Sequence, residues 1–167
     1  MSDEAYTINV EGLNKILKAL KSKPPTARVG ILGGGAHYAQ LNTGAAQPKG
    51  MTTNAEIGAV HEFGSIARNI APRSFLRVPI SEHLQKEMEN SGALDVETMN
   101  EVLRQGSVIP WLKKVSTIAK GIVLEAFATG GFGKWPAWKN PNYTNNAGQL
   151  LVDTTQLRDS IVDEVKE

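Results

Sequence analysis

The sequence predicts an α+β fold: a small, mainly antiparallel sheet packed by an N-terminal amphipathic helix and a long helix in the second half. Residues 6–10 and 161–165 alternate apolar and polar side chains, and residues 27–32 form a third expected strand. Residues 107–129 keep a helical period over about four turns. Residues 11–22 carry apolar side chains at helical spacing, namely Leu13, Ile16, Leu17 and Leu20. This first helix is expected to pack on one face of the sheet.

Three shorter helices are predicted in the middle of the chain. Asn54 is a suitable N-cap for the first, and Gly64 is expected to end it. The second, residues 78–90, begins near Pro79, and Asp95 is expected to cap the third. On the first helix, the sequence places Ile57, Val60 and His61 on one face and Glu56 and Glu62 nearer solvent.

The second half continues with the long helix and a short turn. Ser107 is a suitable cap for the long helix, which Thr129, Gly130 and Gly131 end. Asp153 and Gln156 have the spacing of a capping box for one helical turn. Arg158 on that turn could pair with Asp153. We predict a single domain over residues 1–167, with flexible loops at about 33–53 and 130–149.

Composition argues for a globular protein without catalytic chemistry. The formal net charge is +1, which gives no global electrostatic case for nucleic acid or an anionic membrane. The chain has no cysteine, no signal-peptide pattern at its start and no apolar window of the roughly 18 residues that a membrane span needs. The three histidines, His37, His61 and His83, match no zinc motif. The glycine-rich residues 33–50 match neither nucleotide-binding fingerprint, so neither enzymatic activity nor a cofactor or metal is expected.

The central stretch, residues 56–77, reads EIGAVHEFGSIARNIAPRSFLR. NAEIGAVHEFGS and IAPRSFLRVPI, which overlap this stretch and are separated by a short loop, resemble the central signature of the virion-morphogenesis family of tailed bacteriophages, the neck and tail-completion (head–tail joining) proteins. The distant KWPAW and LLVDTTQLRDSI form a second stretch that resembles the same family. The order and spacing of the two stretches agree with that family. The family usually has glycine where this chain has Thr155, so the turn at 153–155 is expected to differ.

The resemblance implies a function in assembly. It suggests a non-enzymatic virion structural protein that forms a homo-oligomeric ring at the neck or upper tail, completing the tail or joining it to the head connector. A hexamer is favoured and a dodecamer is the alternative ring. Its other partners would be connector, tail terminator or tail tube proteins, without a membrane and without specific nucleic-acid binding, although the genome would pass through the ring. The protein would be made in the host cytoplasm and end in the virion, as a subunit that associates weakly in isolation.

Two other functions stay open from the sequence. One is a phage assembly chaperone. The other is a small nucleic-acid-binding module, in which the lysines of residues 11–22 contact phosphates and the tryptophans stack on bases.

Candidate interface residues lie in the arginine-rich turn, the tryptophan loop and the last helical turn. For the two tryptophans, a place at a subunit interface and a place over the core are equally compatible with the sequence. Core packing is favoured for Phe75 and Leu76. The interface candidates are Arg68, Arg73, Arg77, Trp135, Trp138 and Arg158.

Overall fold

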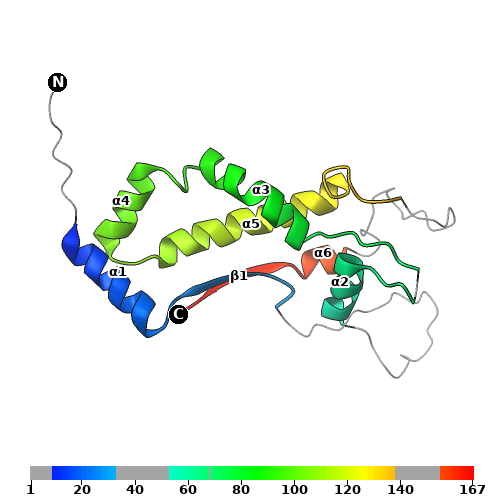
Figure 1. The fold of residues 1–167 in the computed structure, drawn as a ribbon, viewed down its shortest axis with the longest axis horizontal. Coiled ribbons are helices and arrows are strands. Elements are labelled where there is room, and N and C mark those ends of the chain that lie inside the picture. Colours follow the sequence, from blue (N-terminus) through cyan, green and yellow to red (C-terminus); the bar gives the residue numbers. More distant parts are fainter. Residues whose placement is uncertain (1–8, 33–52, 68, 138–154) are drawn as a thin grey trace.

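A two-stranded antiparallel sheet and one long helix form the centre of the molecule. The computed structural model describes residues 9–32, 53–67, 69–137 and 155–167. β1 (Thr26–Gly30) pairs with β2 (Val162–Lys166), with Val29 opposite Asp163. α5 (Ile109–Thr129) packs on both strands, and α3 (Arg77–Asn90) packs on α5 from the other side (Figure 1). The α+β class with a small antiparallel sheet is therefore confirmed.

The sheet contains two strands within the described residues. The predicted strand at 6–10 lies mostly outside them, and its last residue, Val10, begins α1 (Val10–Ser22). Asn9 caps this helix, since its side chain accepts a hydrogen bond from the Gly12 N–H at 2.9 Å. α1 packs against α4 (Val96–Gln105), which follows α3 in the chain.

The contact between α1 and α4 is unusually close at one glycine. A Cβ atom on Gly12 would lie 1.6 Å from the backbone oxygen of Leu103. Only a glycine therefore allows the two helices to approach at this point. Of the apolar face predicted for this helix, Ile16 is buried, while Leu13, Leu17 and Leu20 are 37% to 43% exposed.

At the opposite end of the molecule, α2 (Asn54–Phe63) packs against α6 (Gln156–Asp159) (Figure 1). The predicted cap of α2 was wrong by one residue. Thr53 is the N-cap, and it forms a capping box with Glu56, whose carboxylate accepts from the Thr53 N–H at 2.7 Å. Gly64 ends the helix as predicted, with φ of 77°.

Two further predicted caps have different outcomes. Asp95 holds the N-cap position of α4, as predicted, without a side-chain hydrogen bond. The N-cap of α5 is Val108, so the predicted cap Ser107 was wrong by one residue, although its hydroxyl accepts from the Ile109 N–H at 3.3 Å. Of the predicted loops, the first lies outside the described residues apart from Thr53. The second begins with a hydrogen-bonded turn at 130–137. Asp153 lies outside the described residues, but the N-cap of α6 (Gln156–Asp159) is Thr155, so the predicted capping box between Asp153 and Gln156 was wrong.

The hydrophobic core lies between α5, the sheet and the segment that leads into α3. Its fully enclosed centre contains the aromatic pair Phe75 and Phe127, whose ring centroids are 5.0 Å apart. The core cluster consists of Phe75, Val123, Phe127, Leu157 and Ile161, with Val29, Ile31, Ile57, Leu76, Ile80 and Trp135 packed against it. The preference for core packing at Phe75 and Leu76 is therefore confirmed.

Candidate functional site

A buried carboxylate organises the central stretch. Glu62, near the end of α2, is 5% exposed, whereas the sequence placed it nearer solvent. The prediction was wrong because Glu62 lies one helical turn after Gly58, and both residues are buried. The face of α2 that carries this glycine is therefore the one turned toward the core.

The Glu62 carboxylate caps the N-terminus of α3 from outside that helix. One oxygen accepts from the backbone N–H groups of Phe75 (2.8 Å) and Leu76 (3.0 Å). The other accepts from the Ser74 hydroxyl (2.5 Å) and the Arg77 N–H (3.1 Å). The residue at the N-cap position is Leu76, which has no polar side chain to do this. A negative charge at this point also suits the positive end of the helix dipole.

Arg73 is buried and faces the interior of its own subunit. It is 2% exposed, and its guanidinium donates from Nε to the Pro136 carbonyl (3.0 Å) and from Nη2 to the Ala137 carbonyl (3.2 Å). Its backbone N–H donates to the His61 carbonyl at 2.6 Å. Arg73 therefore attaches the turn at 130–137 to the end of α2, and its guanidinium is covered in the single subunit.

Trp135 has a structural place beside Arg73. Its indole Nε1 donates to the Ser74 carbonyl at 3.0 Å, and its ring meets Phe127 edge-on at a centroid distance of 5.8 Å. The alternative in which this tryptophan covers the core therefore holds for the single subunit. Trp138 lies outside the described residues.

His61 is half-buried, as the sequence predicted for a helix residue. Burial, together with the nearby Arg73 charge, lowers the pKa of His61 to about 4. The imidazole is therefore neutral at physiological pH. Of the other histidines, His83 stacks on Phe132 with centroids 3.9 Å apart, and His37 lies outside the described residues.

A short hairpin projects from this end of the molecule. The backbones of Ser65 and Ile70 exchange two hydrogen bonds of 2.9 Å, and Asn69 takes a left-handed conformation with φ of 52°. Ile66 at its tip is fully exposed, and Phe63 just before it is 68% exposed. Arg68, one of the candidate residues, lies outside the described residues.

Two of the candidate arginines reach solvent. The Arg77 side chain is 67% exposed, with its Nε 3.9 Å from the Glu62 carboxylate. The Arg158 side chain is 39% exposed and pairs with the neighbouring Asp159 at 3.0 Å. The predicted bridge from Arg158 to Asp153 lies outside the described residues. The structure thus brings Arg73 and Trp135 together, and it leaves Arg77 and Arg158 available at the surface.

The described residues contain no group of three or more potential metal-ligating side chains. Among the helices in the described ranges, none is long and apolar enough to cross a lipid bilayer.

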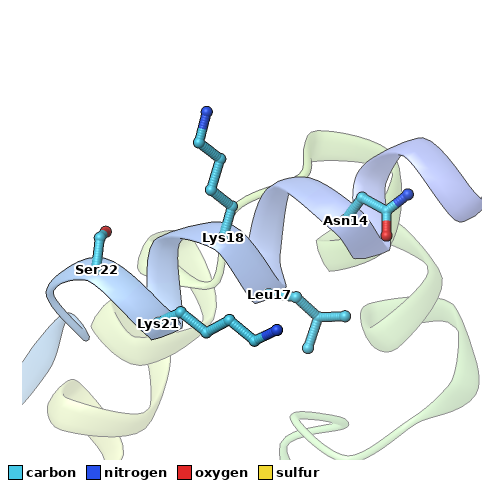
Figure 2. Close-up of a pocket in the computed structure, with 5 residues that line it drawn as sticks. All are labelled: Asn14, Leu17, Lys18, Lys21 and Ser22. Carbon is cyan, nitrogen blue, oxygen red and sulfur yellow. The ribbon is translucent and has the colours of Figure 1, made fainter.

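A second candidate surface, which sequence reasoning missed, lies at the other end of the molecule. Along α1 the apolar side chains of Val10, Leu13, Leu17 and Leu20 are at least one-third exposed. Beside them is a shallow depression on the same helix, lined by Asn14, Leu17, Lys18, Lys21 and Ser22 (Figure 2). The spacing of three, four and three residues along this stripe was the available signal, because it is that of an interhelical seam.

No family model, curated protein or solved structure matches the chain in the three comparisons made.

Proposed function

We propose that the chain is a non-enzymatic structural protein of a tailed-phage virion, which forms a homo-oligomeric ring at the neck or upper tail. There it completes the tail or joins it to the head connector. The proposal starts from the two stretches of sequence that resemble the virion-morphogenesis family.

One structural observation carries the proposal further. The two stretches are far apart in the sequence, yet residues from both belong to one core cluster. Phe75 from the central stretch packs with Leu157 and Ile161 from the second, and Trp135 hydrogen-bonds to Ser74. If the resemblance were a chance similarity of two short peptides, nothing would require them to meet. Their convergence supports a shared structural unit behind the resemblance.

The function would be carried by binding surfaces. A ring repeats one contact between two different faces of each subunit, and it closes when the rotation between neighbours divides a full turn. The exposed hairpin with Phe63 and Ile66, the surface of α1, and the solvent-accessible Arg77 and Arg158 are the available contact regions among the described residues. Exposed apolar side chains at both ends of the molecule favour such a role over that of an isolated monomer.

The test is the copy number of the protein in virions of a phage that encodes it, measured by quantitative mass spectrometry. A parallel light-scattering series gives its mass in solution over a range of concentrations. We expect six or twelve copies per particle and a monomer or small oligomer in solution. Absence from purified particles would overturn the structural role. Salt-sensitive binding to DNA in a gel-shift assay would instead support the nucleic-acid alternative.

A further inference from the structure

We propose that the exposed face of α1 binds the groove between α4 and α5 of a second copy of this chain, and that this head-to-tail contact is the one repeated around the ring. The inference rests on the ring-forming function proposed above and deepens it by naming the two faces.

The first face is an apolar stripe with a basic rim. Val10 is 60% exposed, and Leu13, Leu17 and Leu20 continue the stripe along one side of α1. Lys21 borders the stripe beside Leu17, and Lys18 lies farther round the helix (Figure 2). Neither lysine forms an ion pair within the part of the chain that the structure describes. In Figure 2, the Lys21 side chain extends on the same side of the helix as Leu17, and Lys18 points to the other side.

The second face is a groove of about 360 Å³ with an apolar floor and acidic residues on its α4 side. Val102, Pro110 and Trp111 supply the apolar surface. Glu97 and Glu101 follow one another along α4, one helical turn apart. Glu101 also interacts with Arg104 and accepts a hydrogen bond from Gln105, and Lys114 lies on the α5 side. The acidic edge of this groove thus complements the basic rim of α1.

The outer part of the α1 face and the groove both lie away from the contact between α1 and α4 in one subunit. On α1, Gly12 and Ile16 are the buried residues, and Gly12 meets Leu103 of α4. Because successive residues of a helix are about 100° apart, Asn14 and Lys18 lie on the far side of α1 from Ile16. Val10 and Leu17 lie to one side of Ile16, and Leu13 and Leu20 lie next to it. By the same geometry, Glu101 and Gln105 lie on the far side of α4 from Leu103.

A subunit therefore cannot fill its own groove with its own α1. Contact between two unlike faces of a subunit is heterologous, which is the geometry that builds rings.

Size and length fit this contact. The stripe from Val10 to Leu20 and the ten-residue α4 each extend about 15 Å at 1.5 Å per residue. One pair of such short faces buries less than the roughly 1,200–2,000 Å² of a stable interface. The contact is therefore expected to be weak between two free subunits and to accumulate strength only when several subunits close a ring.

The test uses the absence of cysteine from the natural sequence. Asn14→Cys marks the α1 face and Gln105→Cys marks the groove, each in an otherwise unchanged full chain. A short bismaleimide cross-linker is added to each variant alone and to their equimolar mixture, at concentrations up to the solubility limit. We expect several-fold more cross-linked dimer in the mixture than in either variant alone. Efficient cross-linking of Asn14→Cys with itself, or no excess in the mixture, would overturn the inference.

Charge reversal provides an independent second measurement. The variant with Lys18→Glu and Lys21→Glu, and the variant with Glu97→Lys and Glu101→Lys, should each lose self-association in sedimentation velocity. Their mixture should regain it, because each altered face then meets an oppositely charged partner. Lys86→Glu with Lys166→Glu applies the same change of charge elsewhere and should leave association unchanged. If the mixture of the two charge-reversed variants also fails to associate, the contact between α1 and the groove is contradicted.

The proposed function and this contact fail in different ways. If the protein is present at ring stoichiometry in particles but the charge-reversal pairs assemble normally there, another surface makes the ring. If the protein is absent from particles while the mixed cysteine variants still cross-link, the contact exists but serves a different assembly.

Discussion

The regions at the two ends of α5 differ in how far their side chains find partners within the same chain. At the C-terminal end, the Glu62 carboxylate and the Arg73 guanidinium are buried, and each meets several hydrogen-bond partners. At the N-terminal end, α1 leaves a row of apolar side chains exposed, and its Lys18 and Lys21 form no ion pair in the described residues. At the first end, here called the finished end, the buried charges are matched within one chain, although Phe63 and Ile66 of the neighbouring hairpin stay exposed. The second has the surface of a component that is completed by a neighbour.

The largest expected effect comes from removing the carboxylate that organises the finished end. Glu62→Ala leaves the N–H groups of Phe75, Leu76 and Arg77 without their acceptor at a helix terminus. We expect the free energy of unfolding to fall by about 3 kcal/mol in a denaturant titration. Glu56→Ala removes an exposed capping-box carboxylate from the same helix and should cost only about 1 kcal/mol. Similar losses for the two variants would contradict the special role of Glu62.

A somewhat smaller loss of stability is expected in the turn at 130–137, which packs Trp135 against the core. Gly131 has φ of 68°, and a Cβ added there would lie 2.1 Å from the Trp135 indole nitrogen. Gly133 has φ of 77° and no atom within 4 Å of such a Cβ. Both alanine variants therefore carry the left-handed backbone cost of about 1–2 kcal/mol, and only Gly131→Ala adds a steric conflict of roughly 1 kcal/mol or more. Thermal unfolding of the pair checks this, and equal melting temperatures would refute the contact.

The unfinished end can be perturbed separately through its closest helix contact. Gly12→Ala forces α1 away from the Leu103 carbonyl and should cost about 2 kcal/mol. Gly121→Ala, on α5 with nothing within 4 Å of the added methyl group, should instead stabilise by about 0.5–1 kcal/mol. Hydrogen exchange should show that Gly12→Ala loses protection mainly in α1 and α4. Loss of protection throughout the sheet would mean that the two ends are not separable.

The smallest predicted effect depends on pH and belongs to the finished end. The pKa of His61 is about 4 in the folded chain and near 6.5 when unfolded, so only the unfolded state gains this proton between those values. Stability is therefore complete above pH 6.5 and falls as pH decreases toward 4. Because the ring is partly exposed, we expect only about 1–2 kcal/mol after solvent screening.

His61→Gln should flatten the dependence of unfolding free energy on pH in that window. The carboxylates with lowered pKa values titrate below it. For Asp163, burial raises the pKa, but hydrogen bonds from Lys120 and Thr117 outweigh this and hold the pKa below its ordinary value, so its contribution is lost only at more acidic pH. An unchanged slope between pH 6.5 and 4.5 in His61→Gln would rule out this assignment.

How much the sequence could predict depended on how local the determining interaction was. The long helix, its stop at Gly130 and the strand that became β2 follow from periodicity and glycine chemistry within a few residues. The cap of α2 was missed by one position because Thr53 and Asn54 are both suitable. The Thr-x-x-Glu spacing to Glu56 would have selected Thr53.

The candidate site was harder because its partners are remote in sequence. Glu62 was placed near solvent since a charged residue usually is, and the N–H groups that justify its burial come 13 to 15 residues later. Likewise, nothing near Arg73 shows that carbonyls 63 and 64 residues away accept from its guanidinium. On α1, periodicity identified an apolar face, but a pattern does not state whether the same chain covers it.

The capping of α3 by Glu62 also bears on the order in which the chain acquires structure. α3 has no acidic residue in its first turn and no basic residue in its last, and fourteen residues alone make a marginal helix. During synthesis α2 leaves the ribosome first, so its acceptor is present before the donors at 75–77 emerge. A fragment that begins after Gly64 would lack this template. A peptide of residues 53–90 should therefore contain more helix than a peptide of residues 65–90, by more than α2 itself accounts for.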